Sequence, residues 1–394
     1  MLALVAPGQG AQTPGFLASW LELDGVRDRL SWWSAVTGLD LERYGTTADA
    51  DEIRDTAVAQ PLLVAAGLLG ALALFPHPAD GFAVVGAAAG HSVGELTAAA
   101  GSGVLSAESA LVLVRERGRA MAAAAAVQPT SMSAVMGGDS DEVVTAIEAA
   151  GLTAANVNGA GQVVAAGTVE QLAAFATPAG ARVRALQVAG AFHTDHMAPA
   201  VQRLEALARG VTVRDPRVRL LSNADGAVVH SGREVVERIV AQVRRPVRWD
   251  LCMRTMADLG VTAVIEVPPA GTLTGLIRRA LPGVETVALK TPDDLAAARS
   301  LVERHASQSP PADAPSWRLV VSPLAGTFKA EPGGASLGAT LAPGAAVGAV
   351  VARRQEQPIA APHGGTIVEW LVEDGDPVSP GQPLVRLHPE AAPI

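Results

Sequence analysis

Cysteine is almost absent from this sequence, which has only Cys252 among 394 residues. One cysteine cannot build an internal disulfide framework, so the small disulfide-stabilised folds of secreted proteins are excluded. The residues after Met1, LALVAPGQG, contain neither a basic segment nor a long apolar core, so they do not resemble a secretory signal. We therefore expect a cytoplasmic protein.

Long basic runs and membrane-length apolar runs are missing as well. The formal net charge is -9 and no block of lysine and arginine exceeds a few residues, which argues against a nucleic-acid partner. The most apolar run, residues 61–75, is shorter than the roughly 18–20 residues that span a bilayer. We expect no membrane partner and interpret this run as a buried helix.

The composition is that of a folded chain. Hydrophobic residues make up 49% and charged residues 18%, and the length predicts two or three domains. Strand and helix patterns alternate over residues 1–305, which predicts an α/β fold with a parallel sheet. Expected strands lie at residues 2–6 and 82–88, and expected helices at residues 16–23, 57–74, 95–100 and 107–125.

Two further segments differ from this pattern. Residues 128–188 show strand, helix, strand, strand, helix and strand patterns, the βαββαβ order of a ferredoxin-like unit inserted in the larger fold. Residues 306–316, ASQSPPADAPS, have the composition of a linker. In residues 317–394, SPLAGT is echoed 39 positions later by APHGGT, and APG by SPG, which predicts an all-β module of two similar halves.

The pattern G-x-S-x-G occurs twice, around Ser92 and around Ser336. Such a serine acts as a nucleophile when it stands on a sharp turn between a buried strand and a helix. Ser92 follows a predicted buried strand and precedes a predicted helix, whereas Ser336 lies in a Pro/Gly-rich loop. Ser92 is thus the candidate nucleophile and Ser336 an ordinary turn serine.

A serine hydroxyl needs a general base within hydrogen-bond reach. The segment VAGAFHTDHM offers His193 and His196 at the end of the inserted unit, where a loop residue could face Ser92. The residues alone leave the choice between them open.

Taken together, these residues resemble the malonyl-CoA:acyl carrier protein transacylases and related acyltransferase domains of fatty-acid and polyketide synthases. The resemblance covers residues 1–295. The motifs, in family order, are PGQGAQ (7–12), AQPLL (59–63), GHSVGE (90–95), Arg117-Gly118, NVNGAGQVV (156–164), GAFHT (190–194), SNADG (222–226), QVRRPVRW (242–249) and EVPPAGTLTGL (266–276). It implies an α/β-hydrolase-like large subdomain, a ferredoxin-like small subdomain and an active site between them.

The resemblance also assigns roles by position. It makes Ser92 the nucleophile, His193 its general base, and the backbone carbonyl of Gln242 the group that orients the imidazole. The backbone N–H groups of Gln9 and Val93 would form the oxyanion hole.

A second set of residues would bind the acyl group. Arg117 would hold the free carboxylate of malonate through two parallel charge-assisted hydrogen bonds. Phe192 matches malonyl-selective members of the family. Gln60 and Asn158 are weaker assignments to the pocket, and Asn223 to the support of the cleft; core or turn roles remain open for these three.

Residues 317–394 resemble the biotinyl/lipoyl carrier domain, most closely that of biotin carboxyl carrier proteins, which implies a flattened β-barrel. Those carriers hold the modified lysine in a hairpin where this chain reads Ala352-Arg353-Arg354-Gln355, and the only lysine of the segment is Lys329. Attachment of biotin or lipoate needs an amine, so we expect an unmodified module. A docking element for a protein partner and a merely stabilising appendage both remain open.

The sequence therefore predicts an acyltransferase that moves malonyl from malonyl-CoA through Ser92 to the phosphopantetheine thiol of an acyl carrier protein, without metal or covalent cofactor. Two alternatives remain open. One is a malonyl transferase subunit of a malonate decarboxylase or specialised-metabolite system. The other is a non-catalytic scaffold that recruits a carboxylase through the β module.

Overall fold

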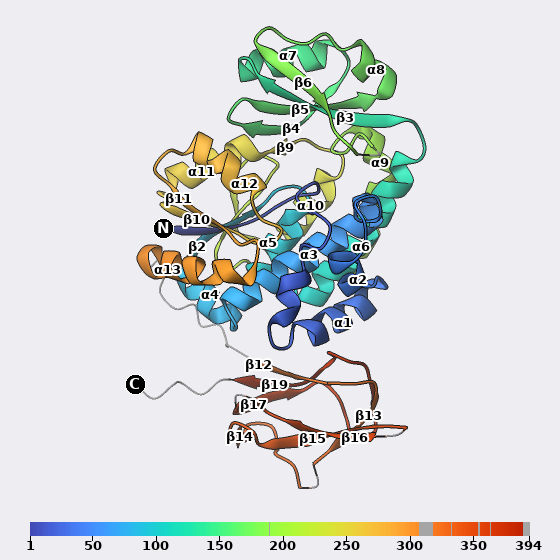
Figure 1. Ribbon diagram of the computed structural model, residues 1–394, viewed down its shortest axis with the longest axis vertical. Coiled ribbons are helices and arrows are strands. Elements are labelled where there is room, and N and C mark those ends of the chain that lie inside the picture. Colours follow the sequence, from blue (N-terminus) through green and yellow to red (C-terminus); the bar gives the residue numbers. More distant parts are fainter. Residues whose placement is uncertain (189, 307–317, 332, 354, 363, 389–394) are drawn as a thin grey trace.

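The computed structural model describes residues 1–188, 190–306, 318–331, 333–353, 355–362 and 364–388. Figure 1 shows three parts along its long axis: a small sheet with helices at the top, a larger α/β part, and an all-β part at the bottom. Apart from Ala306, the predicted linker lies outside the described residues.

A six-stranded sheet in the order β11-β10-β1-β2-β7-β8 forms the centre of the α/β part. All its neighbouring strands are parallel except β7 and β8. Successive residues of a strand point to opposite faces, so Leu2 packs in one core cluster and Ala3 in the other. The strands are β1 (Leu2–Ala6), β2 (Val85–Gly90), β7 (Arg219–Leu221), β8 (Val228–Val229), β10 (Ala263–Glu266) and β11 (Glu285–Ala288).

Helices cover both faces of this sheet. One face packs against α3 (Thr56–Leu74), α5 (Gly94–Gly101), α6 (Ala107–Ala125), α9 (Ala198–Gly210), α10 (Gly232–Gln242) and α13 (Leu295–His305), and the other against α11 (Trp249–Asp258) and α12 (Thr272–Ala280). Within the described residues α3 alone is long and apolar enough to cross a membrane, but 78% of it is buried inside the protein. It is the buried helix that the apolar run predicts.

The N-terminal third departs from the predicted elements. The strand predicted from residue 82 begins at Val85, because Pro78 opens the short helix α4 (Pro78–Val84) and its fixed φ suits the first helical turn. The helix predicted at residues 16–23 is only a 3-10 segment, η1 (Ala18–Glu22). The sequence patterns missed the helices α1 (Val26–Thr37) and α2 (Leu41–Thr46).

The inserted part has the predicted βαββαβ order. It comprises β3 (Thr130–Gly137), α7 (Ser140–Ala149), β4 (Thr153–Gly159), β5 (Gln162–Thr168), α8 (Val169–Ala174) and β6 (Ala181–Ala185). Its strands pair antiparallel in the order β6-β3-β5-β4. A late strand, β9 (Val247–Arg248), joins the edge parallel to β4 and connects this sheet directly to α11 of the larger part.

The C-terminal part is all-β, as predicted. Two four-stranded sheets, β12-β19-β17-β14 and β16-β15-β13-β18, enclose a core around Phe328 and Val350. All their strand pairs are antiparallel. The strands are β12 (Arg318–Val321), β13 (Gly326–Ala330), β14 (Thr340–Leu341), β15 (Ala346–Ala352), β16 (Gln355–Ala360), β17 (Gly365–Trp370), β18 (Pro377–Val378) and β19 (Pro383–His388).

The sequence repeat is visible in this arrangement. The SPLAGT motif leads into β13 and its echo into β17, and the two strands lie in different sheets. Each short strand pairs with a strand from the other half of the repeat. Leu341 of β14 lies opposite Gly365 of β17, and Val378 of β18 lies opposite Gly326 of β13. Each half of the repeat therefore contributes strands to both sheets.

The β part contacts the α/β part through a few groups. The Arg318 Nε atom donates a hydrogen bond of 2.7 Å to His77 Nε2, next to α4. A Cβ atom on Gly381 would lie 1.9 Å from the backbone oxygen of Asp28 in α1, so the β19 turn meets this helix backbone to backbone. Figure 1 shows the β part next to α1.

Candidate active site

Ser92 stands on a tight turn between β2 and α5. Its φ is 54°, a left-handed conformation that a non-glycine residue keeps only where its surroundings enforce it. A Cβ atom on Gly90 would lie 1.9 Å from the backbone carbon of Gly94, and one on Gly94 would lie 2.2 Å from the oxygen of Ala6. Backbone packing thus requires both glycines of the motif.

His193 faces this serine. Its Nε2 atom lies 2.7 Å from Ser92 Oγ, and its Nδ1 atom lies 2.8 Å from the backbone oxygen of Gln242. Because a carbonyl can only accept, Nδ1 carries the proton and Nε2 offers its lone pair to the serine hydroxyl. Burial, together with the nearby positive charge of Arg117, lowers the pKa of His193 to about 3, so the imidazole is neutral.

His196, the other candidate base, lies three residues further on in the 3-10 turn η3 (Asp195–Met197). It is half-buried and, in the part of the chain that the structure describes, makes no hydrogen bond to Ser92. The structure brings His193 and not His196 to the serine.

Arg117 points from α6 toward the same serine and is only 2% exposed. Its Nη2 atom lies 3.5 Å from Ser92 Oγ and donates to Gln242 Oε1 at 3.0 Å, and its Nη1 atom donates to Gln60 Oε1 at 2.7 Å. The buried Nε atom has no partner among the described residues. Burial lowers the pKa of Arg117 to about 10, which still leaves a cation at neutral pH.

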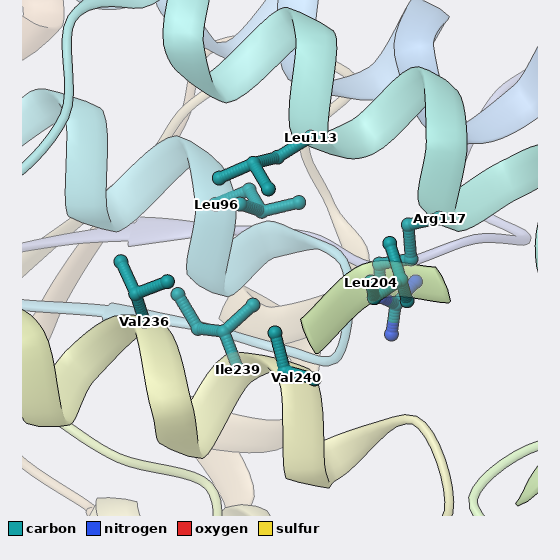
Figure 2. A pocket seen from close by; sticks show the side chains of 7 residues that line it. All are labelled: Leu96, Leu113, Arg117, Leu204, Val236, Ile239 and Val240. Carbon is teal, nitrogen blue, oxygen red and sulfur yellow. The ribbon is translucent and has the colours of Figure 1, made fainter. Parts of the chain in front are cut away.

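The apolar stem of Arg117 borders a small apolar pocket, shown in Figure 2 between α5, α6, α9 and α10. The cavity measures about 10 Å³, room for about one water molecule. Its lining is otherwise aliphatic: Leu96, Leu113, Leu204, Val236, Ile239 and Val240. This packing holds the side chain from behind and leaves the guanidinium end for the site.

Asn223 and Glu95 hold the Ser92 turn through hydrogen bonds. The side chain of Asn223 accepts the backbone N–H of Ser92 at 2.8 Å and donates to the oxygen of Gly90 at 2.7 Å. Glu95 accepts the backbone N–H of Asn223 at 2.6 Å and the Gln242 amide at 2.5 Å. Both residues are buried.

The two N–H groups assigned to an oxyanion hole belong to two segments next to the serine turn. Val93 precedes α5, so its N–H belongs to the positive end of that helix. Gly8 touches the serine turn, since a Cβ atom on it would lie 3.6 Å from Ser92 Cβ, and Gln9 follows directly. Within the described residues, neither Gln9 nor Val93 donates its backbone N–H to an acceptor.

The remaining assigned residues lie further out. Asn158 accepts a hydrogen bond of 2.8 Å from His91 Nε2, next to Ser92 in the chain, and within the described residues it makes no hydrogen bond to Ser92 or Arg117. Phe192 is 6% exposed and belongs to the main core cluster beside His193. Ser336, the second pattern match, is exposed in a turn between β13 and β14.

Comparison with known proteins identifies the family of the chain. The family model described as "Acyl transferase domain" matches residues 4–295. The chain belongs to the acyl transferase family. The match ends before the C-terminal β part begins at Arg318.

Several relatives of known name belong to the same family. The chain is 51% identical to the malonyl CoA-acyl carrier protein transacylase of Mycobacterium tuberculosis over 298 residues, which are 75% of this chain and 98% of that protein. The transacylase of Escherichia coli K12 is 33% identical over 309 residues, 76% of this chain and 99% of the relative.

Solved structures give the same result. The crystal structure of the M. tuberculosis enzyme superposes with a TM-score of 0.72 at 49% identity and covers 76% of this chain and 99% of its own. A malonyl-transacylase solved in complex with a type II polyketide acyl-carrier protein superposes with a TM-score of 0.72 at 28% identity, covering 76% of this chain and 99% of its own.

Within this acyltransferase site, sequence reasoning left two residues without a firm role. Asn223 was one of several polar residues for which a turn or core role remained open. The sequence does contain a sign of the role of Glu95, because it is the one charged residue of α5, GELTAAAG, whose other residues are small, apolar or hydroxylic. No cluster of three or more His, Cys, Asp or Glu side chains suited to a metal occurs in the described part of the chain.

Proposed function

We propose that this acyltransferase moves a malonyl group from malonyl-CoA to the phosphopantetheine thiol of an acyl carrier protein, for fatty-acid or polyketide synthesis. The observation that carries the proposal is a buried arginine beside the nucleophile. Arg117 lies 3.5 Å from Ser92 Oγ, and its direct side-chain partners, Gln60 and Gln242, present neutral oxygens. A buried cation with neutral partners favours an anionic acyl group, because a buried charge is stabilised chiefly by its opposite.

In the first half-reaction Ser92 Oγ attacks the thioester carbonyl carbon while His193 Nε2 takes its proton. The thioester oxygen becomes an oxyanion between the N–H groups of Gln9 and Val93, where donors held in place in advance stabilise the transition state. The intermediate collapses when the carbon–sulfur bond breaks. His193 returns the proton to the leaving thiolate, so coenzyme A departs as the thiol and malonyl stays as an ester on Ser92.

The second half-reaction reverses these steps with a different thiol. The phosphopantetheine thiol gives its proton to His193 and attacks the ester carbonyl, and the proton then returns to Ser92 as the carbon–oxygen bond breaks. Water is the competing nucleophile. Arg117 fixes the malonyl carboxylate, so the ester is oriented for an incoming thiol rather than being free in the site.

The test is the covalent intermediate. The protein is incubated with malonyl-CoA and its intact mass is measured, with the Ser92→Ala variant as the matched control. We expect a malonyl adduct on the wild type and none on the variant, followed by its transfer to added holo-acyl carrier protein. A wild type that forms no adduct would exclude the transferase and favour a scaffold. An adduct formed from acetyl-CoA but not from malonyl-CoA would exclude the role of Arg117.

For the C-terminal part we propose a biotinyl/lipoyl-like module that carries no prosthetic group. In support, its two halves exchange strands between two sheets, and the segment Ala352-Arg353-Arg354-Gln355 contains no lysine where such carriers read A-M-K-M around their modified lysine. Lys329 lies on β13 opposite Ala349 of β15, within the sheet rather than at the hairpin tip. A guanidinium cannot form the amide that biotin or lipoate requires.

Intact-mass analysis of protein purified from its native host tests this proposal. We expect the unmodified mass. A mass increase equal to biotin or lipoate, mapped by peptide sequencing to residues 317–394, would overturn it.

A further inference from the structure

The proposed reaction leaves the buried acid nearest the nucleophile in the chain, Glu95, unused. Glu95 is 5% exposed and lies in the first turn of α5, three residues after the nucleophile. It contacts neither Ser92 Oγ nor His193 in the described structure, and burying a carboxylate is costly unless its oxygens are hydrogen-bonded. Both of its oxygens are: Oε1 accepts the backbone N–H of Asn223 and Oε2 accepts Gln242 Nε2.

Gln242 connects this acid to the rest of the site. Its backbone oxygen accepts the His193 Nδ1 proton, while its side-chain amide lies between Glu95 and Arg117. The amide nitrogen donates to Glu95 Oε2 at 2.5 Å and to Asn223 Oδ1 at 2.9 Å, so two acceptors fix its orientation. The amide oxygen must then point the other way, toward Arg117 Nη2, 3.0 Å distant.

Glu95 and Arg117, the two ends of this chain of contacts, interact electrostatically. Burial raises the pKa of Glu95 to about 8, and the Asn223 N–H and the positive charge of Arg117 oppose the rise. In turn, the negative charge of Glu95 opposes the effect of burial on the pKa of Arg117. Both Glu95 oxygens face N–H donors, an arrangement that suits the carboxylate, because a protonated oxygen would place O–H against N–H.

We propose that Glu95 is a positioning residue for the acyl-carboxylate clamp: through the Gln242 amide it aims the guanidinium of Arg117 at the malonyl group. The inference rests on the proposed malonyl transfer. Replacement of the carboxylate by an amide removes one acceptor. The one remaining oxygen can accept either the fixed backbone N–H of Asn223 or the Gln242 amide. When it accepts the backbone N–H, the Gln242 amide either meets a donor or rotates, and a rotated amide places its NH₂ group against Arg117.

The experiment compares two reactions of Ser92 in the Glu95→Gln variant at about pH 8.5, where the wild-type carboxylate is mostly ionised. One is malonyl loading from malonyl-CoA, which uses Arg117. The other is sulfonylation by phenylmethylsulfonyl fluoride, which has no carboxylate and reports only on the serine, the histidine and the oxyanion donors. We expect the second-order rate of malonyl loading to fall about 10- to 100-fold, the effect of a clamp displaced by about 1 Å, with sulfonylation within about 2-fold of wild type.

The matched control is Glu266→Gln. Glu266 is also a buried glutamate, 0% exposed, but its oxygens accept backbone N–H groups of Gly271, Leu273 and Thr274 at the start of α12. We expect this variant to lower the melting temperature while the ratio of malonyl loading to sulfonylation stays that of the wild type.

Each other outcome is decisive. An equal fall in both reactions of Glu95→Gln would make Glu95 a support of the serine turn only, and no fall in either would remove it from the site; both overturn the proposal. If Glu95→Gln does not fold, Glu95→Asp decides by the same comparison, because it keeps a carboxylate but shortens the side chain that reaches the Gln242 amide. A wild type that sulfonylates but forms no malonyl adduct would overturn the proposed function and this inference with it.

Discussion

His193 donates its Nδ1 proton to the backbone oxygen of Gln242 at 2.8 Å, the position that a carboxylate occupies in a Ser-His-Asp triad. A backbone carbonyl fixes the tautomer as a carboxylate does but carries no full negative charge. The imidazole therefore has no anionic partner to raise its pKa, and burial together with Arg117 lowers that pKa to about 3.

The first prediction concerns the pH dependence of Ser92 reactivity. With a pKa of about 3, His193 remains an unprotonated base throughout the neutral and mildly acidic range. The rate constant of Ser92 sulfonylation by phenylmethylsulfonyl fluoride should therefore change less than about 2-fold between pH 8 and pH 5. An inflection near the ordinary histidine pKa of 6.5 would show that the imidazole is not desolvated as described.

The same group predicts a pH-dependent stability. His193 takes up its proton near 6.5 in the unfolded chain and near 3 in the folded one, so below 6.5 the unfolded state binds more protons and is favoured. The loss grows as the pH falls from 6.5 to 3 and amounts to about 2 kcal/mol at pH 5, at 1.36 kcal/mol per pH unit. Urea unfolding of wild type and His193→Gln at pH 7.5 and pH 5 should show a smaller loss in the variant. Equal losses would contradict the buried, neutral histidine.

The third prediction separates the charge of Arg117 from its shape. Arg117→Lys keeps a cation but loses the planar fork that contacts Gln60, Gln242 and Ser92 together. We expect the kcat/KM for malonyl loading to fall about 100-fold, equivalent to about 2.7 kcal/mol of transition-state stabilisation. Stopped-flow or quenched-flow loading assays measure it. Loading within a factor of three of wild type would mean that a point charge suffices.

The fourth prediction concerns the glycines of the turn. Gly94→Ala would place a methyl group 2.2 Å from the backbone oxygen of Ala6, a clash that only a backbone shift relieves. Gly101, at the end of the same helix, has nothing within 4 Å of the corresponding position. We expect Gly94→Ala to lose about 3 kcal/mol or more of unfolding free energy and its Ser92 reactivity, and Gly101→Ala to change stability by less than about 1 kcal/mol. Chemical denaturation of both variants measures the difference, and equal stabilities would contradict the turn geometry.

The sequence predicted the elements whose patterns are strong. Buried parallel strands such as β1 and β2 are continuous apolar runs. Helix α6 begins after Ser106, a typical capping residue, whose side chain accepts the N–H of Ser109. Short or weakly amphipathic elements were missed, notably α1 and α2. In residues 78–84, Pro78 started a helix where the apolar letters FAV suggested a strand.

Part of the candidate site could also be predicted: the motif and its strand–turn–helix setting single out Ser92, whereas His193 and Arg117 were assigned by the family resemblance, because the residues alone leave the base open between His193 and His196. The distances between Ser92, His193 and Arg117 could not be predicted from the sequence. Asn223, Gln242 and Glu95 come from three different elements, and only the fold shows that their side chains meet under one turn. A polar residue in a loop or helix gives no sign in the sequence of which distant partner satisfies it.

Because strands are exchanged between its two halves, the C-terminal part should not tolerate the loss of either half. Because β13 and β15 of the first half pair within one sheet while β14 pairs with β17 of the second half in the other, neither half holds a complete sheet. A chain that ended after β16 would lose strands from both sheets and would expose the apolar core around Phe328 and Val350 to water. The two repeats thus form a single unfolding unit rather than two tandem ones.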